Sequence, residues 1–425
     1  MINNNLAVNR KGNAWLVRIA DVCFVFYILT AFLCERTSVG QLGLFLFVAV
    51  GMLCGICVNF RMFKFYFLCD IIFMLFCFYQ IHANIAINTD ASEKALSTYA
   101  LCFLMYLALF GYLMLKKDMY HVFRLCLNTL LCAFIINYLV DIDKLFTGRF
   151  HNNEGIVIGG IKIGGVTAVS LGWLAGVCMF LNLLLNFKDK KEKQYWIIFA
   201  VLAVTILLSG TRKALLFAVP VFFLKYYFGA NVKKHRSLLV AMIVVSAAAL
   251  LAYTVVLTVP VLYNSIGIRL QAIFTDSAAD DGYSMITREN LIKQAIAVFQ
   301  RRPATGWGLD AFATTFSVNE IYSHNNFLEI LVAGGIVGCV LYYMKYLCLF
   351  LLLLRACIKK RNSELIKPLV TLLLFLVTTT VLEYWQVTYY TRKFMMFHII
   401  ILAFVELTRT TEVRRTAEFV KEEHV

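Results

Sequence analysis

The sequence predicts an all-α polytopic membrane protein, and three observations support this fold class. Of the 425 residues, 61% are hydrophobic and 15% are charged, whereas a soluble domain is about half apolar and a quarter charged. The mean hydropathy of the chain is +0.76. Apolar runs near the length of about 20 residues that a spanning helix needs recur along the chain, and Lys and Arg gather in alternate connections between them.

Twelve apolar runs are expected to form the membrane helices. They cover roughly residues 14–34, 39–60, 65–82, 95–115, 119–140, 164–187, 195–209, 213–228, 237–259, 325–352, 366–384 and 394–408. The first run is expected to be a retained signal anchor, because it is long enough to span. The chain then divides into nine helices over 1–259, a long outer loop over 260–324, and three helices with a tail over 325–425.

The distribution of Lys and Arg predicts the orientation in the membrane. Basic residues fill the loops around Lys116, Lys190 and Lys233, and also the C-terminal tail. Loops of this kind stay in the cytoplasm, so both termini are expected there. The formal net charge of +15 therefore reflects topology, and no nucleic-acid partner is expected.

No metal or other cofactor is predicted. The 13 cysteines fall in or at the ends of apolar runs, where thiols behave as small hydrophobic groups, and no Cys/His cluster has zinc spacing. Asp141 and Asp143 form an Asp-x-Asp pair that could hold a divalent metal, but the pattern is short and unspecific. The sequence also contains no phosphate-binding or dinucleotide-binding glycine fingerprint.

His324 is the principal candidate for catalysis, because it stands at the start of a long apolar helix on the predicted outer face. Ser323 is expected to cap that helix. The partial positive charge of the helix N-terminus would keep the imidazole neutral and able to accept a proton. Asn325 and Glu329 add polar groups that could bind substrate. The alternative is that His324 only caps or packs.

Arg212 lies in a Ser-Gly-Thr-Arg-Lys turn between two short apolar runs, with Lys213 beside it. Residues 195–228 are too few for two full spans and a turn, so the apex of this hairpin is expected within the membrane, lining a cavity. The alternative is that Arg212 extends to the lipid headgroups.

The outer loop contains one amphipathic stretch, 287–301, which begins with Thr287-Arg288 and is followed by Pro303. It is expected to lie on the membrane surface, and its remaining basic residues are expected to meet anionic lipid. These are Lys293, Arg301 and Arg302. Arg288 is a candidate ligand for a phosphate group. Arg149 is a further, weaker candidate, before a glycine-rich stretch over 155–165 that is expected to be a flexible or re-entrant loop.

These candidates suit glycosyl transfer from a lipid-linked pyrophosphate. Arginine forks bind phosphate oxygens bidentately and stabilise a departing pyrophosphate, while a neutral histidine can act as base toward an attacking sugar hydroxyl. A lipid-linked donor would keep its tail in the bilayer and its headgroup in the outer cavity.

At these residues the chain resembles the O-antigen polymerase and O-antigen ligase family of bacterial membrane glycosyltransferases. The resemblance rests on the His-Asn-x-Phe-Leu stretch and its glycines over 324–338, on Ser-Gly-Thr-Arg at 209–212, and on Arg288 upstream of Gly306-Trp307-Gly308. It implies a metal-independent inverting enzyme of the bacterial inner membrane. It also implies that Arg212 and Arg288 bind the lipid pyrophosphate while His324 acts on the acceptor hydroxyl, at the periplasmic face.

Within that family a polymerase is favoured, because most surface-polysaccharide gene clusters contain one. It would join repeat units carried on undecaprenyl pyrophosphate, and its partners would include membrane lipid and the chain-length regulator and flippase of the same pathway. An O-antigen ligase acting on lipid A-core is the first alternative. A polysaccharide flippase is the second, although the two similar halves expected of such a transporter are not visible in the sequence.

Overall fold

Nine of the described helices are long and apolar enough to cross a membrane, which supports the all-α polytopic fold. The computed structural model describes residues 13–34, 37–58, 65–140, 156–158, 161–163, 167–229, 234–268, 281–317, 320–386, 389 and 396–409. The nine are α2 (Ala14–Leu33), α3 (Ser38–Cys57), α4 (Phe65–His82), α5 (Thr89–Lys116), α6 (Met119–Val140), α7 (Ala168–Asp189), α8 (Glu192–Ser209), α14 (Asn326–Lys359) and α15 (Ile366–Leu382) extended by η5 (Glu383–Trp385).

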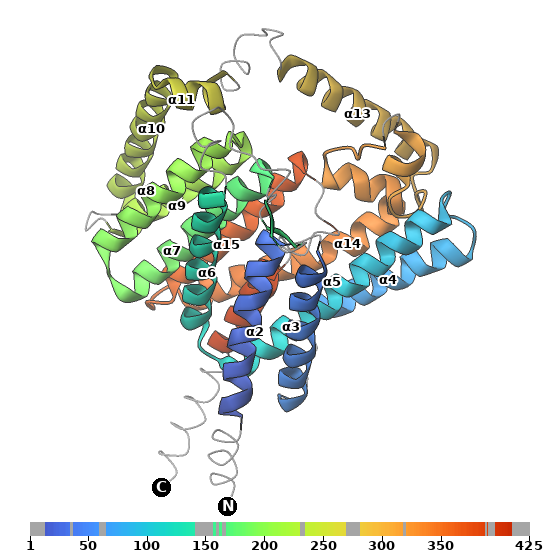
Figure 1. Cartoon of the computed structure of the whole chain (residues 1–425), viewed down its shortest axis with the longest axis horizontal. Helices are drawn as coiled ribbons and strands as arrows, with labels where there is room; N and C mark the ends of the chain where they lie inside the picture. The colour runs from blue at the N-terminus through green and yellow to red at the C-terminus, as the bar shows by residue number, and fades with distance from the viewer. Residues whose placement is uncertain are drawn as a thin grey trace, which may run out of the picture.

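The other three predicted spans also coincide with helices, but the expected number of twelve is not confirmed. α9 (Leu215–Gly229) has 15 residues and contains Pro220, so it is shorter than the usual spanning length. α10 (Lys234–Thr258) lies beside α9 and leads into α11 (Pro260–Leu262) and η3 (Tyr263–Gly267) (Figure 1). The last apolar run is helical over the described residues 396–409.

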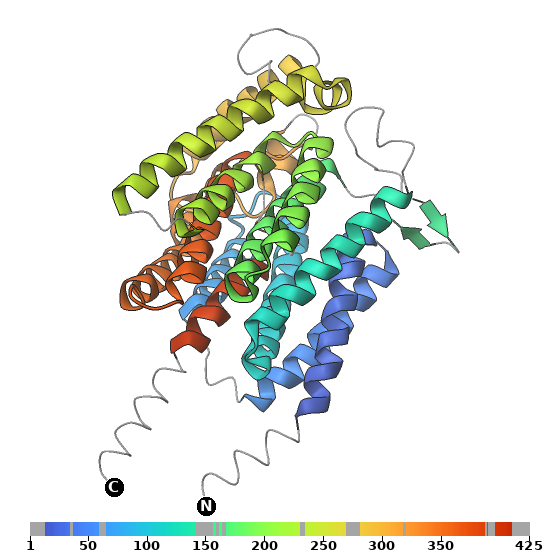
Figure 2. The same ribbon diagram turned by 90° about the vertical axis from the view of Figure 1, so that its left-hand side faces the viewer.

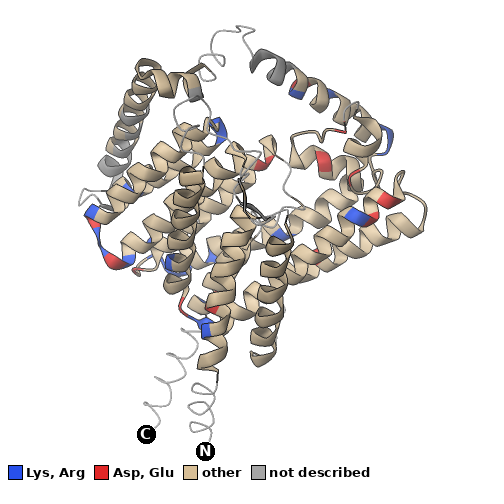
Figure 3. Cartoon of the chain, in the orientation of Figure 1, with Lys and Arg blue, Asp and Glu red and all other residues tan. Residues whose placement is uncertain are grey.

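α7 lies at the centre of the bundle, with 89% of its apolar window buried. It packs against α6, α8, α9 and α15, while α2 packs beside α3 and α6 (Figures 1 and 2). Small residues permit a close crossing between α3 and α5, where a Cβ on Gly51 would lie 2.6 Å from the Ala108 carbonyl oxygen. Charged residues are sparse over these helices and more frequent at helix ends and on α13 (Asp281–Arg301), as Figure 3 shows.

A short β-hairpin corrects the prediction of a loop over 155–165. β1 (Ile156–Ile158) pairs antiparallel with β2 (Ile161–Ile163), so that Ile156 is opposite Ile163. The β-branched residues favour extended backbone, and two glycines separate the strands in the sequence. The fold is therefore helical apart from this hairpin within the part of the chain that the structure describes.

α14 is broken at Gly335, where the sequence predicted a continuous helix. Gly335 has φ 61° and ψ −161°, a conformation that only glycine adopts readily. The turn over 303–308 fills the break. Pro303 and Ala304 carbonyls accept hydrogen bonds from the Ile336 and Val337 amides, at 2.8 and 3.2 Å. The Ile336 and Val337 amides, whose helical acceptors would be Val332 and Ala333, therefore keep partners across the break.

The same turn donates back to the helix. The Trp307 and Gly308 amides bond the carbonyls of Val332 and Ala333, each at 2.9 Å. Gln80 of α4 closes the junction, because its amide nitrogen donates to the carbonyls of Thr305 (2.6 Å) and Ala333 (2.9 Å). The 303–308 turn is therefore fixed to the first turns of α14.

Gly335→Ala is expected to lower the free energy of unfolding by about 1–3 kcal/mol from the backbone conformation alone. A Cβ there would also lie 2.3 Å from the Ala304 carbonyl oxygen. Gly334→Ala is the matched control, since its Cβ would meet Phe76 at an ordinary 3.4 Å. Thermal unfolding of the two purified variants in detergent would compare them, and equal Tm values would contradict the role assigned to the break.

Candidate functional site

His324 lies at the end of the segment over 320–325, directly before Asn325, the residue that precedes α14. Its φ is 57°, in the left-handed region that His tolerates better than most residues. The imidazole is half-buried and its ring centroid lies 4.7 Å from that of Tyr322. The side chains on either side, Ser323 and Asn325, are buried. The chain therefore fixes the backbone around an imidazole that remains partly accessible.

Asn325, and not Ser323, is the N-cap of α14. Its side-chain oxygen accepts from the Leu328 amide at 3.2 Å. Ser323 instead bonds Glu329, to which it donates from its amide (3.0 Å) and its hydroxyl (2.7 Å). The prediction of a Ser323 cap was wrong because both residues are good caps and the sequence alone does not show which one reaches the helix.

Glu329 is 2% exposed and lies one turn inside α14. Its Oε2 accepts both hydrogen bonds from Ser323, so this carboxylate holds the segment that carries His324. The geometry suits a positioning residue better than the substrate ligand that the sequence suggested, because a side chain this buried is not accessible to a glycan.

The pKa of His324 is lowered to about 4, which keeps the imidazole neutral at physiological pH. Burial is the main cause, and the positive charges of Arg288 and Lys213 follow. Neutrality was expected from the sequence on the basis of the helix N-terminus, and the structure adds burial and the two cations as causes. Arg288 and Lys213 come from two other segments of the chain, so residues from three segments interact electrostatically at His324.

The 209–214 turn is fixed against α7. Gly210 ends α8 with φ 60°, and the Thr211 hydroxyl donates to the Ala168 carbonyl at 2.9 Å. Gly172 of α7 makes the approach possible, since a Cβ there would lie 2.6 Å from the Ser209 hydroxyl. Arg212 then begins η2 (Arg212–Ala214) and is half-buried.

Lys213 connects this turn to the end of α15. Its ammonium group donates to the Gln386 side-chain oxygen at 2.8 Å and to the Trp385 carbonyl at 3.4 Å. Both acceptors lie in or directly after η5. Lys213 therefore has protein partners, and its charge still reaches His324.

Arg288 is exposed on α13, which begins earlier than the predicted 287–301 helix. Part of the apolar face of α13 packs against protein: Leu291, Ala295 and Val298 are buried in a cluster with Phe312 and Val332. The sequence pattern showed the apolar face but not the partner that covers it, which comes from η4 (Phe312–Phe316) and α14.

Two of the three basic residues expected to face lipid have protein partners. Arg302 donates to the Ile85 carbonyl at 2.7 Å and lies over the Trp307 ring at 4.6 Å. Lys293 pairs with Glu289 one turn away, at 2.7 Å. Arg302 therefore fixes the loop, which corrects the prediction for this residue, whereas Arg301 is exposed at the end of α13.

A second buried cluster, which sequence reasoning did not assign to the site, joins α14 to η5. Glu383 accepts from the Asn326 amide group (3.0 Å) and from the Tyr343 hydroxyl (2.9 Å), both on Oε2. Tyr346 donates to its Oε1. The available signal in the sequence was an acidic residue, Glu383, at the end of an apolar run.

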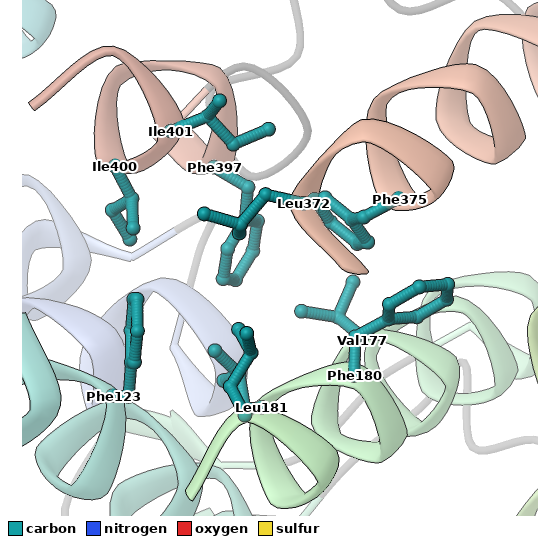
Figure 4. A pocket seen from close by; sticks show the side chains of 10 residues that line it. Phe123, Val177, Phe180, Leu181, Leu372, Phe375, Phe397, Ile400 and Ile401 are labelled. Carbon is teal, nitrogen blue, oxygen red and sulfur yellow. The ribbon is translucent and has the colours of Figure 1, made fainter. Parts of the chain in front are cut away.

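Arg149, Asp141 and Asp143 lie outside the described residues. Within the described ranges no group of three or more His, Cys, Asp or Glu side chains could hold a metal ion. A pocket between α6, α7, α15 and the helix over 396–409 is lined entirely by apolar residues such as Phe123, Phe180 and Phe397 (Figure 4). It offers no polar group for chemistry, so it is not part of the candidate site.

The fold and the site together define a multi-pass membrane protein in which a neutral histidine and basic residues meet at the ends of helices. Residues 197–343 match the family model described as O-Antigen ligase, a range that includes Arg212, Arg288 and His324. The match covers about a third of the chain. It supports the O-antigen polymerase and ligase family, whose members are glycosyltransferase-like membrane enzymes. No curated protein matches the chain.

Proposed function

We propose that this protein polymerises oligosaccharide repeat units carried on undecaprenyl pyrophosphate, at the outer face of the bacterial inner membrane. The observation that carries the proposal is the neutral His324 imidazole under the combined charge of Arg288 and Lys213. Those cations suit the binding of a pyrophosphate, and the imidazole suits a base.

In the proposed reaction, His324 accepts the proton of the acceptor sugar hydroxyl as its oxygen attacks the anomeric carbon of the donor glycan. The bond between that carbon and the pyrophosphate oxygen breaks, and its electron pair leaves with undecaprenyl pyrophosphate. Arg212 and Arg288 stabilise the charge on the leaving group. Attack opposite the leaving group inverts the anomeric configuration.

The bound pyrophosphate also changes the basicity of His324. In the free site two cations and burial disfavour the imidazolium form. The negative charge of the pyrophosphate offsets these cations, so the pKa of His324 rises when the donor binds. The base is therefore strengthened in the complex in which it has to act.

Purified protein in lipid vesicles, supplied with lipid-linked repeat units, tests the proposal. A ladder of products supports a polymerase. A single transfer to lipid A-core, with no ladder, would replace it by a ligase. Movement of the lipid-linked glycan across the bilayer without any new glycosidic bond would overturn the proposal in favour of a flippase.

Arg212→Lys is expected to lower kcat/KM for the lipid-linked donor by about 10- to 100-fold. Lysine keeps the charge but loses the bidentate fork, and a charge-assisted hydrogen bond is worth roughly 1.5–3 kcal/mol. Initial rates over a range of donor concentrations would measure the loss. Arg301→Lys, at an exposed position on α13, is the control, and equal rates for both variants would show that Arg212 does not bind the donor.

A further inference from the structure

η5 lies between the two segments that supply the proposed base and one of its cations. On one side, Glu383 bonds Asn326, which follows His324 by two residues. On the other side, Trp385 and Gln386 accept hydrogen bonds from Lys213, the neighbour of Arg212. The histidine segment and the 209–214 turn are therefore linked through one short helix.

Glu383 is the anchor of this link. It is 3% exposed, and its two oxygens accept from Asn326 of the histidine segment and from two tyrosines further along α14, Tyr343 and Tyr346. Asn326 is also held from a third direction, because its side-chain oxygen accepts from the Tyr389 amide at 3.1 Å. A buried carboxylate with this many donors has a fixed position and orientation.

We propose that Glu383 is a positioning residue, which sets the placement of Lys213 and Arg212 relative to His324. This inference rests on the proposed function for its effect on catalysis. Glu383 itself is not accessible to substrate, since its oxygens face donors from α14, so it acts through Asn326 on one side and through the backbone of η5 on the other.

A positioning role differs from a purely structural role in what it changes. Loss of a structural residue lowers the amount of folded enzyme, but each folded molecule keeps its rate. Loss of a positioning residue lowers kcat per folded molecule, because small displacements of reacting groups cost large factors in rate. Donor binding through the arginine forks survives, so KM changes little.

The test compares Glu383→Gln, which keeps the size of the side chain, with the wild-type enzyme and with Glu406→Gln. Glu406 is another buried glutamate, near the end of the helix over 396–409. Rates are divided by the amount of folded protein, measured by size-exclusion chromatography. Glu383→Gln is expected to lower kcat by about 10- to 100-fold with KM nearly unchanged, while Glu406→Gln keeps the wild-type kcat.

A second measurement separates this inference from the proposed function. In protein labelled with ¹⁵N-histidine, the pKa of His324 can be followed by NMR in nanodiscs without any substrate. Displacement of Lys213 in Glu383→Gln changes the charge acting on the imidazole, so its pKa is expected to move from about 4 toward the ordinary 6.5. An unchanged pKa together with an unchanged kcat per folded molecule would overturn the positioning role.

A failure of the positioning role and a failure of the proposed function would give different results. If the wild-type protein forms no glycosidic bond with lipid-linked repeat units, the proposed function fails. A shift of the His324 pKa in Glu383→Gln would then still establish that Glu383 positions the cations around the imidazole. Rescue is also expected: Glu383→Asp keeps the charge and should recover part of kcat relative to Glu383→Gln, whereas a role for side-chain volume alone would favour Glu383→Gln.

Discussion

His324→Ala is expected to abolish chain extension while leaving the protein folded. A positioned histidine base contributes about 10²–10⁴ in rate, and the fold around it does not depend on the imidazole. Asn325 caps α14, and Glu329 holds Ser323. Because residue 324 has a left-handed backbone, His324→Asn is the better second variant, since Asn tolerates that conformation.

Product ladders from reconstituted variants would measure the effect, and thermal unfolding would show whether each variant is folded. His82→Ala is the matched control, because His82 is exposed at the end of α4 and its ring contacts only Phe78 among the described aromatic pairs. Extension at the wild-type rate by a folded His324→Asn variant would remove the base assignment.

The pH dependence gives a further test of the same residue. The pKa of His324 is about 4 in the folded protein, below its ordinary value of 6.5, so the imidazole stays neutral down to about pH 4. The pH profile of kcat/KM reports the free enzyme, and its acid limb is expected near pH 4. The acid limb of the kcat profile is expected at a higher pH, because bound pyrophosphate raises the pKa of His324. Lys213→Gln should move the acid limb of the kcat/KM profile to a higher pH, since it removes one of the cations that lower the pKa of His324.

The lowered pKa of His324 also makes the free energy of unfolding depend on pH. The unfolded chain binds the proton more readily than the native protein between pH 6.5 and 4, so the contribution of His324 to stability is complete above pH 6.5 and is lost as the pH falls toward 4. An acid limb of kcat/KM near pH 6.5 would contradict both the burial of the imidazole and its exposure to the charges of Arg288 and Lys213.

The helices and the histidine segment could be predicted from the sequence because both are local features. An apolar run of about 20 residues indicates a spanning helix wherever it occurs, and α2 to α8 begin and end within a few residues of the predicted runs, apart from the earlier start of α5. His324, Arg212 and Arg288 were notable because charged or titratable groups are rare beside apolar helices.

The break in α14 could not be predicted, because the residues that stabilise it lie 28 to 32 positions earlier in the chain. The backbone groups around Gly335 are satisfied by Pro303, Ala304 and Trp307, and a hydropathy pattern does not show such a partner. The same reason explains why the apolar face of α13 was assigned to lipid, since the cluster that covers it is made by later segments of the chain.

The role of Glu383 depends on contacts between distant segments as well. A carboxylate at the end of α15 is visible in the sequence, but its donors come from α14, 37 to 57 positions earlier. Sequence spacing on one helix predicts neighbours only three or four positions apart. The polar groups that complete the candidate site therefore became apparent only when the packing of α14, η2 and η5 was known.

Asp70→Ala is expected to cause the largest loss of stability, because it would leave a buried ammonium group without its counter-charge. Lys345 of α14 donates to Asp70 of α4 at 2.7 Å, and both side chains are fully buried. Tyr99 bonds both groups, and Lys345 lies over the Tyr342 ring at 4.4 Å. Breaking a buried pair by removing one partner costs about 3–5 kcal/mol.

The double variant Asp70→Leu with Lys345→Met should recover most of that loss. One oxygen of Asp70, Oδ2, has no hydrogen-bond partner in the structure, so the native pair does not fully offset the cost of burying two charges, and an apolar pair removes that cost. Unfolding of the single and double variants in mixed micelles would give the comparison. A single variant as stable as the wild type would show that Lys345 finds another partner. A double variant that is stable and still extends chains would limit the pair to the packing of α4 on α14, whereas a stable but inactive one would make the charge of Lys345 part of the catalytic site.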